Sequence, residues 1–341
     1  MSDSVLAITI IWVFLFIYSI AGSIDFGAGF WAMASMRRRD NHAASIANLY
    51  LSPSWKVTNV FLVLLVVALV GFFPHAVYVL GSVLLLPAGL MLVLLIIRST
   101  FMVYAYSVRR YVRLLTVVSG VTGLLIPGLL ISVLPVSLGG FVTMESGYPQ
   151  LLFGKLLGSV TEYAHLAFGI STELFLSALF LADYAREADD EDTYRYYRVR
   201  AILLGPLTLI TAILVTVTFA PEAQWILPNL QRVEGWFALS VTAFLIGYSA
   251  LFWRSGRENP GKPRAAVIAI VLQYGLAVFA YGKAHLPYIV YPSQTIDQSV
   301  TNHSMFVSLL TGYIVFSAIL APVFVWFWRL FFKDKGYLRQ E

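Results

Sequence analysis

The sequence contains no cysteine, and this absence excludes several kinds of site. Without thiols the chain can form no disulfide, thiolate metal site, cysteine-ligated iron–sulfur cluster or c-type haem attachment of its own. Charged residues are also scarce, at 12% of the 341 residues, against about a quarter in a soluble protein. Apolar residues make up 59%, and the mean hydropathy is +0.78. Such a chain cannot cover its surface with polar groups, so we expect lipid to surround most of it.

Histidine is scarce as well, which bears on cofactors. A haem b within a membrane is commonly held by histidines inside helices. Of the five histidines, only His165 falls within a predicted helix, so no two of them can face each other at membrane depth. We therefore expect this chain to bind no haem and no metal ion by itself. The sequence also has no nucleotide-binding glycine loop and no serine-nucleophile motif.

Nine apolar segments are each long enough to cross a bilayer as a helix of about 20 residues. They span residues 5–35, 56–73, 75–98, 113–135, 160–184, 200–220, 236–254, 265–283 and 305–329. Met1-Ser2-Asp3-Ser4 lacks the basic residues of a signal peptide, so we expect the first helix to stay in the protein. The sequence predicts an all-α, polytopic membrane protein in which residues 1–341 form a single integral membrane domain.

Basic residues gather at alternate ends of these segments and predict the orientation of the chain. They follow the first, third, fifth, seventh and ninth segments: Arg37, Arg38 and Arg39; Arg98, Arg109, Arg110 and Arg113; Arg186, Arg195, Arg198 and Arg200; Arg254, Arg257, Lys262 and Arg264; Arg329, Lys333, Lys335 and Arg339. Lysine and arginine mark the cytoplasmic side of a membrane protein. All five basic ends share one side only if the chain crosses nine times, with its N-terminus outside and its C-terminus cytoplasmic. The net charge of +5 is thereby explained without a nucleic-acid partner.

One acidic residue, Asp25, lies inside the first apolar segment. It precedes the basic end by about ten residues, or roughly 15 Å of helix, and an ionised carboxylate at that depth costs about 2.5–3.5 kcal/mol. Its neighbours one helical turn away include Gly22, Ala28 and Gly29, whose small size lets another helix approach closely. We therefore expect Asp25 at a helix–helix contact. Two roles stay open: a carboxyl of a proton path, or a structural acid that is protonated or hydrogen-bonded to a neighbouring helix.

The fifth segment carries a second set of polar and small residues at helical spacing. Glu162, His165, Gly169, Glu173 and Ser177 follow one another at intervals of three or four and so share one face. Acids on two separate helices, one of them with a histidine on its face, indicate a hydrated interior or a proton path. Polar contacts that hold packed helices together would produce the same pattern.

Several motifs resemble those of subunit II of the cytochrome bd quinol oxidases. Residues 23–30, Ser-Ile-Asp-Phe-Gly-Ala-Gly-Phe, are similar to the Gly-Phe-Asp-x-Gly signature of that family. Residues 52–61, Ser-Pro-Ser-Trp-Lys-Val-Thr-Asn-Val-Phe, resemble its Pro-x-Trp-Asp-Gly-Asn stretch. Three further features match in place: Phe72-Phe73-Pro74, Arg98 and Pro287-Tyr288-Ile289-Val290-Tyr291-Pro292-Ser293. The resemblance covers both ends of the chain, whereas residues 113–260 agree only in hydropathy.

The resemblance implies a haem-free subunit with two four-helix bundles plus one peripheral helix. Subunit I of such oxidases carries two b haems and haem d, oxidises menaquinol or ubiquinol, and reduces oxygen to water with protons from the cytoplasm. This chain would pack against subunit I, together with a small single-helix subunit, in the cytoplasmic membrane of a bacterium or archaeon. Membrane lipid would surround this chain, and the resemblance also allows a bound structural lipid or quinone. Asp25 falls on the matching acid of the family, which favours a proton path with Asp25, Glu173 and His165.

Lys56 departs from the family pattern. Many relatives have an acid directly after the tryptophan, followed by Gly-Asn, whereas this chain has Lys56, Val57 and Thr58. A proton route through that acid therefore cannot be carried over to this chain, and the departure indicates a divergent branch of the family.

A secondary transporter is the alternative reading, with Asp25 and Glu173 coupling an ion to a solute. Transporters of this kind often have matched, glycine- or proline-broken helices in two inverted halves. The glycine-rich break in the first segment has no clear counterpart in the sixth, which favours the oxidase subunit. A membrane scaffold without chemistry, the third reading, would leave both acids unexplained.

Overall fold

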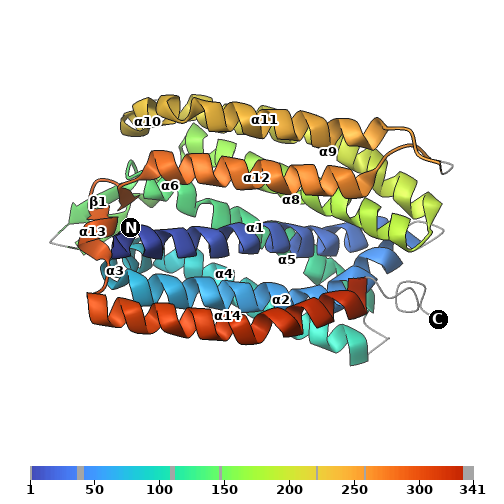
Figure 1. Ribbon diagram of the computed structural model, residues 1–341, viewed down its shortest axis with the longest axis horizontal. Helices are drawn as coiled ribbons and strands as arrows, with labels where there is room; N and C mark the ends of the chain where they lie inside the picture. The colour runs from blue at the N-terminus through green and yellow to red at the C-terminus, as the bar shows by residue number, and fades with distance from the viewer. Residues whose placement is uncertain are drawn as a thin grey trace.

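The computed structural model describes residues 2–36, 42–107, 112–145, 148–219, 222–256 and 259–332. Long helices run side by side, and short elements gather at the end where β1 and α13 lie (Figure 1). The α-helices are α1 (Asp3–Ser35), α2 (His42–Phe72), α3 (Pro74–Val83), α4 (Leu85–Ser107), α5 (Val112–Ile131), α6 (Val133–Ser137), α7 (Phe153–Leu157), α8 (Val160–Glu187), α9 (Glu191–Thr218), α10 (Leu227–Arg232), α11 (Glu234–Ser249), α12 (Pro263–His285), α13 (Ile296–Ser299) and α14 (His303–Phe332). The remaining elements are the 3-10 helices η2 (Gln224–Ile226) and η3 (Ala250–Phe252) and the strands β1 (Val142–Glu145), β2 (Tyr148–Leu151), β3 (Tyr288–Val290) and β4 (Gln294–Thr295).

Within these ranges, nine helical stretches are long and apolar enough to cross a membrane. They are Asp3–Ser35, Pro53–Phe72, Leu85–Tyr104, Val112–Ser137, Val160–Glu187, Glu191–Thr218, Glu234–Phe252, Pro263–His285 and His303–Trp326. The prediction of a helical, polytopic membrane protein with nine spanning helices is confirmed. Several basic residues on which the predicted orientation depends lie outside the described residues: Arg37, Arg38, Arg39, Arg109, Arg110, Arg257, Lys333, Lys335 and Arg339.

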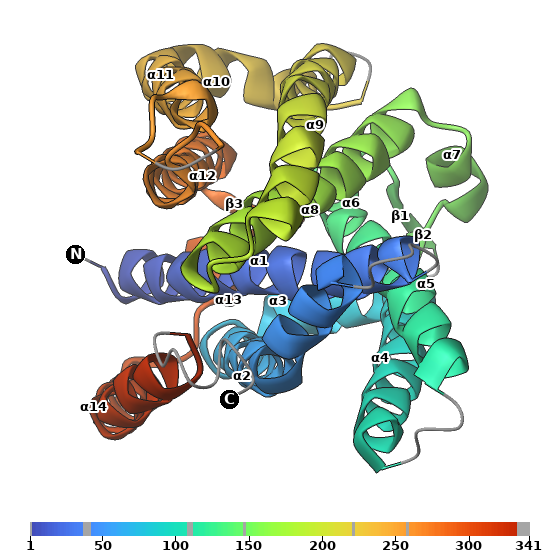
Figure 2. The ribbon, with the colours of Figure 1, turned by 90° about the vertical axis from the view of Figure 1, so that its right-hand side faces the viewer.

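Helix α1 runs through the middle of the molecule and contacts helices on both sides (Figure 2). It packs on α2 and α5, and α5 in turn packs on α4. It also packs on α8 and α12, and these pair with α9 and α11 respectively. In the most apolar stretch of α8, 61% of the residues are buried, whereas in that of α14, at the edge of the molecule, only 6% are buried. Among the spanning helices of the described residues, α8 is therefore the most deeply enclosed, and it packs on α1.

Helix α2 begins at His42, well before the predicted start at residue 56. Ala43, Ile46, Ala47 and Tyr50 recur at helical spacing and are all buried, Tyr50 against the ring of Tyr184 at 5.7 Å between centroids. This first part is amphipathic, and the side chains outside its apolar stripe lower its average hydropathy. A search for continuous apolar runs therefore misses it, although its periodicity indicates a helix.

The third and fourth predicted segments are each divided in two. Residues 75–98 fall in α3 and α4, which meet at Leu84, and α4 runs on through Phe101 to Ser107. Pro87 follows this break and lacks the N–H that would bond the carbonyl of Val83. Pro135 stands in the same relation to the break between α5 and α6. Proline therefore accounts for both breaks.

Two long segments predicted as loops contain short hairpins. In residues 136–159, β1 pairs antiparallel with β2, and in residues 284–304, β3 pairs with β4. The two loops meet, because Tyr291 N–H donates to the Ser137 carbonyl at 3.0 Å. The Trp225 ring stacks on Tyr291 with centroids 4.5 Å apart. These contacts close one end of the helix bundle.

Candidate functional site

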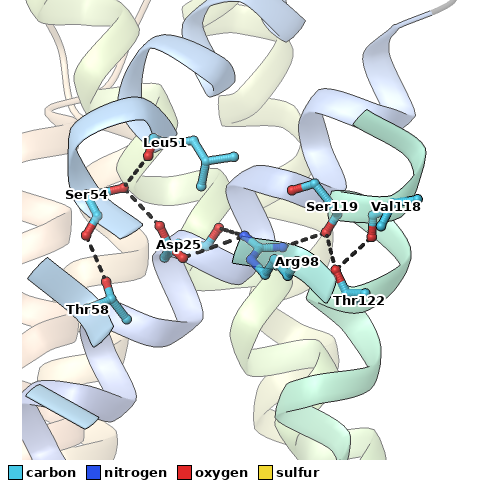
Figure 3. Close-up of polar contacts among 8 residues, drawn as sticks. All are labelled: Asp25, Leu51, Ser54, Thr58, Arg98, Val118, Ser119 and Thr122. Carbon is cyan, nitrogen blue, oxygen red and sulfur yellow. Dashed lines mark hydrogen bonds and ion pairs between the residues drawn. The ribbon is translucent and has the colours of Figure 1, made fainter. Parts of the chain in front are cut away.

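Asp25 lies on α1 at a contact with α2 and α4, with only 3% of its side chain exposed. Ser54 Oγ of α2 donates to Asp25 Oδ1 at 3.0 Å. Arg98 Nη2 of α4 lies 3.6 Å from Asp25 Oδ2 and donates to the Asp25 backbone carbonyl at 3.0 Å. Figure 3 shows these three side chains in a row that continues to Ser119 and Thr122 of α5. The carboxylate thus has one hydroxyl donor and one cation.

Arg98 occupies a position that the sequence analysis did not predict. From the sequence, Arg98 is expected among the basic residues at a helix end. Its side chain is instead only 3% exposed and faces Asp25. Because α4 runs on to Ser107, Arg98 lies roughly 13 Å of helix inside the bundle. Arg98 Nη1 donates to the Ser119 carbonyl at 2.5 Å, and the guanidinium lies 5.0 Å from the Phe26 ring centroid. A buried guanidinium requires such partners, which the interior of this bundle supplies.

Ser54, and not Lys56, faces the acid from α2. The two residues are two positions apart, which is about 200° around a helix, so they point to opposite faces. Lys56 is exposed, with Nζ 5.9 Å from the Trp55 ring centroid. Lys56, the departure from the family motif, therefore lies on the face of α2 that points away from Asp25. A helical wheel that includes the start of α2 would have indicated Ser54.

Glycines allow the helices to meet at this site. A Cβ added to Gly29 would lie 2.9 Å from Ser119 Oγ and 3.0 Å from Arg98 Nη1. A Cβ added to Gly123 of α5 would lie 2.5 Å from the Phe26 carbonyl oxygen. Ala28 is fully buried, whereas a Cβ on Gly22 would make an ordinary 3.4 Å contact with the Phe26 ring. Close approach therefore depends on Gly29 and Gly123, and less on Gly22.

Glu173 lies on α8, where that helix packs on α1, and it is fully buried. Among the described residues neither of its carboxyl oxygens has a hydrogen-bond partner. A Cβ added to Gly27, two residues after Asp25, would lie 3.0 Å from the Glu173 backbone oxygen. Arg98 interacts electrostatically with Glu173 as well as with Asp25. The structure thus brings both predicted acids under the influence of one guanidinium.

His165 belongs to a different group, although it shares α8 with Glu173. Eight residues separate them, or about 12 Å of helix. His165 Nδ1 lies 2.7 Å from the Thr161 carbonyl, which can only accept, so Nδ1 carries the hydrogen. Nε2 is buried without a partner among the described residues. Nearby on the same helix, Glu162 Oε1 accepts a 2.5 Å hydrogen bond from Ser132 Oγ. The predicted polar face of α8 therefore divides into two groups.

A search of the described residues finds no cluster of three or more histidine, aspartate or glutamate side chains that could hold a metal ion. The Asp25 site offers two carboxyl groups and one guanidinium. Its two carboxyl groups can exchange protons, and its guanidinium, which stays protonated in proteins, can stabilise either carboxylate.

Comparison with known proteins gives consistent matches along the chain. A family model described as cytochrome bd terminal oxidase subunit II matches residues 4–331. A protein of Bacillus subtilis (strain 168), whose name places it as a cytochrome bd menaquinol oxidase subunit II, is 44% identical over 342 residues, which cover 100% of this chain and 99% of that protein. The solved structure of bd oxidase from Geobacillus thermodenitrificans contains a chain that matches with a TM-score of 0.82 and 35% identity. That match covers 98% of this chain and 100% of the other.

Proposed function

The chain belongs to the subunit II family of the cytochrome bd terminal oxidases, and from that premise we propose that it supports a haem-bearing subunit I and provides part of a proton path. It is a multi-pass membrane protein and a subunit of an oxidoreductase. The alternative of a secondary transporter has no comparable support.

The buried group of Asp25, Ser54, Arg98 and Glu173 carries the proposal of a proton path. Reduction of oxygen to water consumes protons, and carboxyl groups at membrane depth are the usual groups that pass them. Two acids on facing helices, both acted on by one guanidinium, suit this task better than simple helix packing. His165 lies farther along α8 and would serve a separate, outer part of the path.

The proposed architecture follows from the helix contacts. One four-helix bundle would comprise α1, α2, α4 and α5, a second α8, α9, α11 and α12, and α14 would be peripheral. The N-terminus would lie outside and the C-terminus in the cytoplasm. Arg98 is buried and no longer supports this orientation. Arg113, which is exposed at the start of α5, still supports it. Asp25 would then lie in the cytoplasmic half, on the side from which protons enter.

The proposed partners and cofactors follow from the family. Subunit I would hold two b haems and haem d and oxidise the quinol, while this chain holds no haem. The name of the Bacillus relative favours menaquinol over ubiquinol as the electron donor. A small single-helix subunit, membrane lipid and a structural lipid or quinone complete the assembly that we propose, in the cytoplasmic membrane of a bacterium.

Replacement of the buried acid tests the proposed proton path. Asp25→Asn keeps the size of the side chain but removes its acidic group and its negative charge, so quinol-driven oxygen uptake by the purified complex should fall while the haem absorbance shows normal assembly. Asp192→Asn is the matched control, since Asp192 is exposed at the start of α9. Oxygen uptake as fast in Asp25→Asn as in Asp192→Asn would reject the proton path through Asp25.

A further inference from the structure

We propose that Glu173 carries the exchangeable proton of this site, that Asp25 remains ionised, and that Arg98 couples the two acids. The inference rests on the proposed function and deepens it, because it assigns a different protonation state to each acid. One proton would then be taken up and released at Glu173, with Arg98 stabilising the carboxylate that is left behind.

The two acids differ in their hydrogen-bond donors. Asp25 receives a hydrogen bond from Ser54 Oγ at 3.0 Å and faces Arg98 at 3.6 Å, so its carboxylate is stabilised. Glu173 is equally removed from solvent but receives no hydrogen bond from the described residues. An ionised carboxylate without donors is far more costly to bury than a neutral carboxyl. Glu173 therefore holds the proton in the resting site.

Ser177, one helical turn after Glu173 on the same helix, has a hydroxyl that is already engaged by other groups. Ser177 Oγ donates its one hydrogen to the Glu173 backbone carbonyl at 2.6 Å. The same oxygen accepts a hydrogen bond from Trp31 Nε1 of α1 at 2.9 Å. Ser177 is thereby held away from the carboxyl group by two contacts. The arrangement leaves Glu173 free to gain or lose a proton without breaking a hydrogen bond of its carboxyl group to the protein.

The charges of the site also allow only one acid to be ionised. Arg98 is the cation that acts on Asp25 and Glu173, and two carboxylates beside it would leave an uncompensated negative charge in a buried place. Within the described part of the chain, the phenols of Tyr18 on α1 and Tyr50 on α2 also interact with this group. Phenols are ordinarily neutral at physiological pH. The neutral combination is one guanidinium, one carboxylate and one carboxyl.

Backbone carbonyls hold Arg98 in a fixed position. Nη1 donates to the Ser119 carbonyl at 2.5 Å and Nη2 to the Asp25 carbonyl at 3.0 Å, so the guanidinium does not depend on the Asp25 carboxylate for its place. It can thus stabilise Glu173 electrostatically whenever that residue loses its proton. Arg98 is a positioning residue for the proton and does not itself exchange one.

Infrared difference spectroscopy of the whole oxidase complex tests the assignment. The wild-type complex should show the carbonyl stretch of a buried protonated carboxyl that changes between the oxidised and the reduced enzyme and shifts in deuterated water. Glu173→Gln should abolish this band. Asp25→Asn removes the carboxylate that balances Arg98, so Glu173 should then be ionised in part at rest and the band should weaken without moving. Glu173→Asp should move the band, which covers the case in which Glu173→Gln does not assemble. A band that is lost in Asp25→Asn and unchanged in both Glu173 variants would overturn the assignment.

Arg98→Lys and Arg98→Gln test the coupling. Lysine keeps the charge, so the Glu173 band should still change between the two redox states, whereas glutamine should freeze it in the protonated form. A band that still changes in Arg98→Gln contradicts the coupling. Oxygen uptake that is unaffected in both Asp25→Asn and Glu173→Gln would instead refute the proposed proton path itself. Reduced uptake together with a band assigned to Asp25 would refute only this inference.

Discussion

Asp25 and Arg98 stabilise each other as ions because neither side chain reaches solvent. Their closest ion-pair distance, 3.6 Å, is longer than the two hydrogen bonds that Arg98 donates to backbone carbonyls. The backbone carbonyls therefore hold the Arg98 guanidinium in place. The Asp25 carboxylate is stabilised by this cation, whose position does not depend on the ion pair. Removal of either partner should expose this dependence.

The expected cost of removing the guanidinium is large. Arg98→Met leaves the Asp25 carboxylate buried with only Ser54 as a donor, and loss of one partner of a buried pair costs about 3–5 kcal/mol. The thermal midpoint and the yield of the purified complex should fall, while Arg113→Met, a control at an exposed position of α5, should change little. Asp25→Asn combined with Arg98→Met should recover part of the loss. Equal midpoints for Arg98→Met and Arg113→Met would contradict the buried pair.

The two acids of the site can be predicted from the sequence, whereas the contacts that determine their environment are harder to predict. Asp25 and Glu173 are conspicuous because an acid in an apolar run is costly. Arg98 was assigned to a helix end because a basic residue after an apolar run usually marks one, yet the apolar pattern resumes after it and α4 ends only at Ser107. Ser54 is indicated only by a helical wheel that includes the start of α2, and the apolar run alone does not reveal that start. The contacts of Asp25 with Ser54 and Arg98 depend on how helices far apart in the sequence pack together.

At the scale of elements, the contact between α1 and α8 depends on a residue without a side chain. A Cβ on Gly27 would clash with the Ser177 side chain and lie 3.0 Å from the Glu173 carbonyl oxygen. The two helices can therefore pack at this depth only while Gly27 remains. The same contact determines how near Glu173 lies to the Arg98 site.

Gly27→Ala should separate α1 from α8 and destabilise the protein by about 1–3 kcal/mol, as overpacking of a filled interior does. Gly89→Ala in α4 is the matched control, because a Cβ there meets no atom within 4 Å. Alanine in a helix that has room for it is neutral or slightly stabilising. Thermal unfolding of the two purified variant complexes measures the difference. A midpoint for Gly27→Ala at or above that of Gly89→Ala would show that α1 and α8 are not closely packed there.

Hydropathy predicts the spanning helices of this chain because lipid requires long apolar runs whose backbone groups are bonded internally. It does not predict where helices continue past the apolar core or where they bend. The start of α2 is amphipathic and packs on other parts of the protein, as the burial of Tyr50 against Tyr184 shows. The break at Leu84 could have been predicted from Pro87, which follows it.

At the scale of the whole molecule, polar groups occupy two kinds of place. Most basic side chains lie at the ends of helices, whereas Asp25, Arg98 and Glu173 lie within the bundle. The apolar side chains of α14 face outward along most of its length, and only 6% of the residues in its most apolar stretch are buried. A bundle whose outer surface is apolar and whose interior encloses Asp25, Arg98 and Glu173 suits a protein that holds a proton site inside a membrane.

The proposed orientation can be measured directly because the chain contains no cysteine. Single cysteines introduced by Tyr148→Cys in β2 and Arg254→Cys in the segment after α11 lie in two loops that we predict on opposite sides of the membrane. Tyr148 is 63% exposed and Arg254 is exposed as well, so both positions can react. A maleimide that does not cross membranes should label Tyr148→Cys in intact cells, but Arg254→Cys only after permeabilisation. The unchanged chain is the control and should stay unlabelled. The reverse pattern would place Asp25 in the outer half of the membrane, remote from cytoplasmic protons, and the proton path would then need a different entrance.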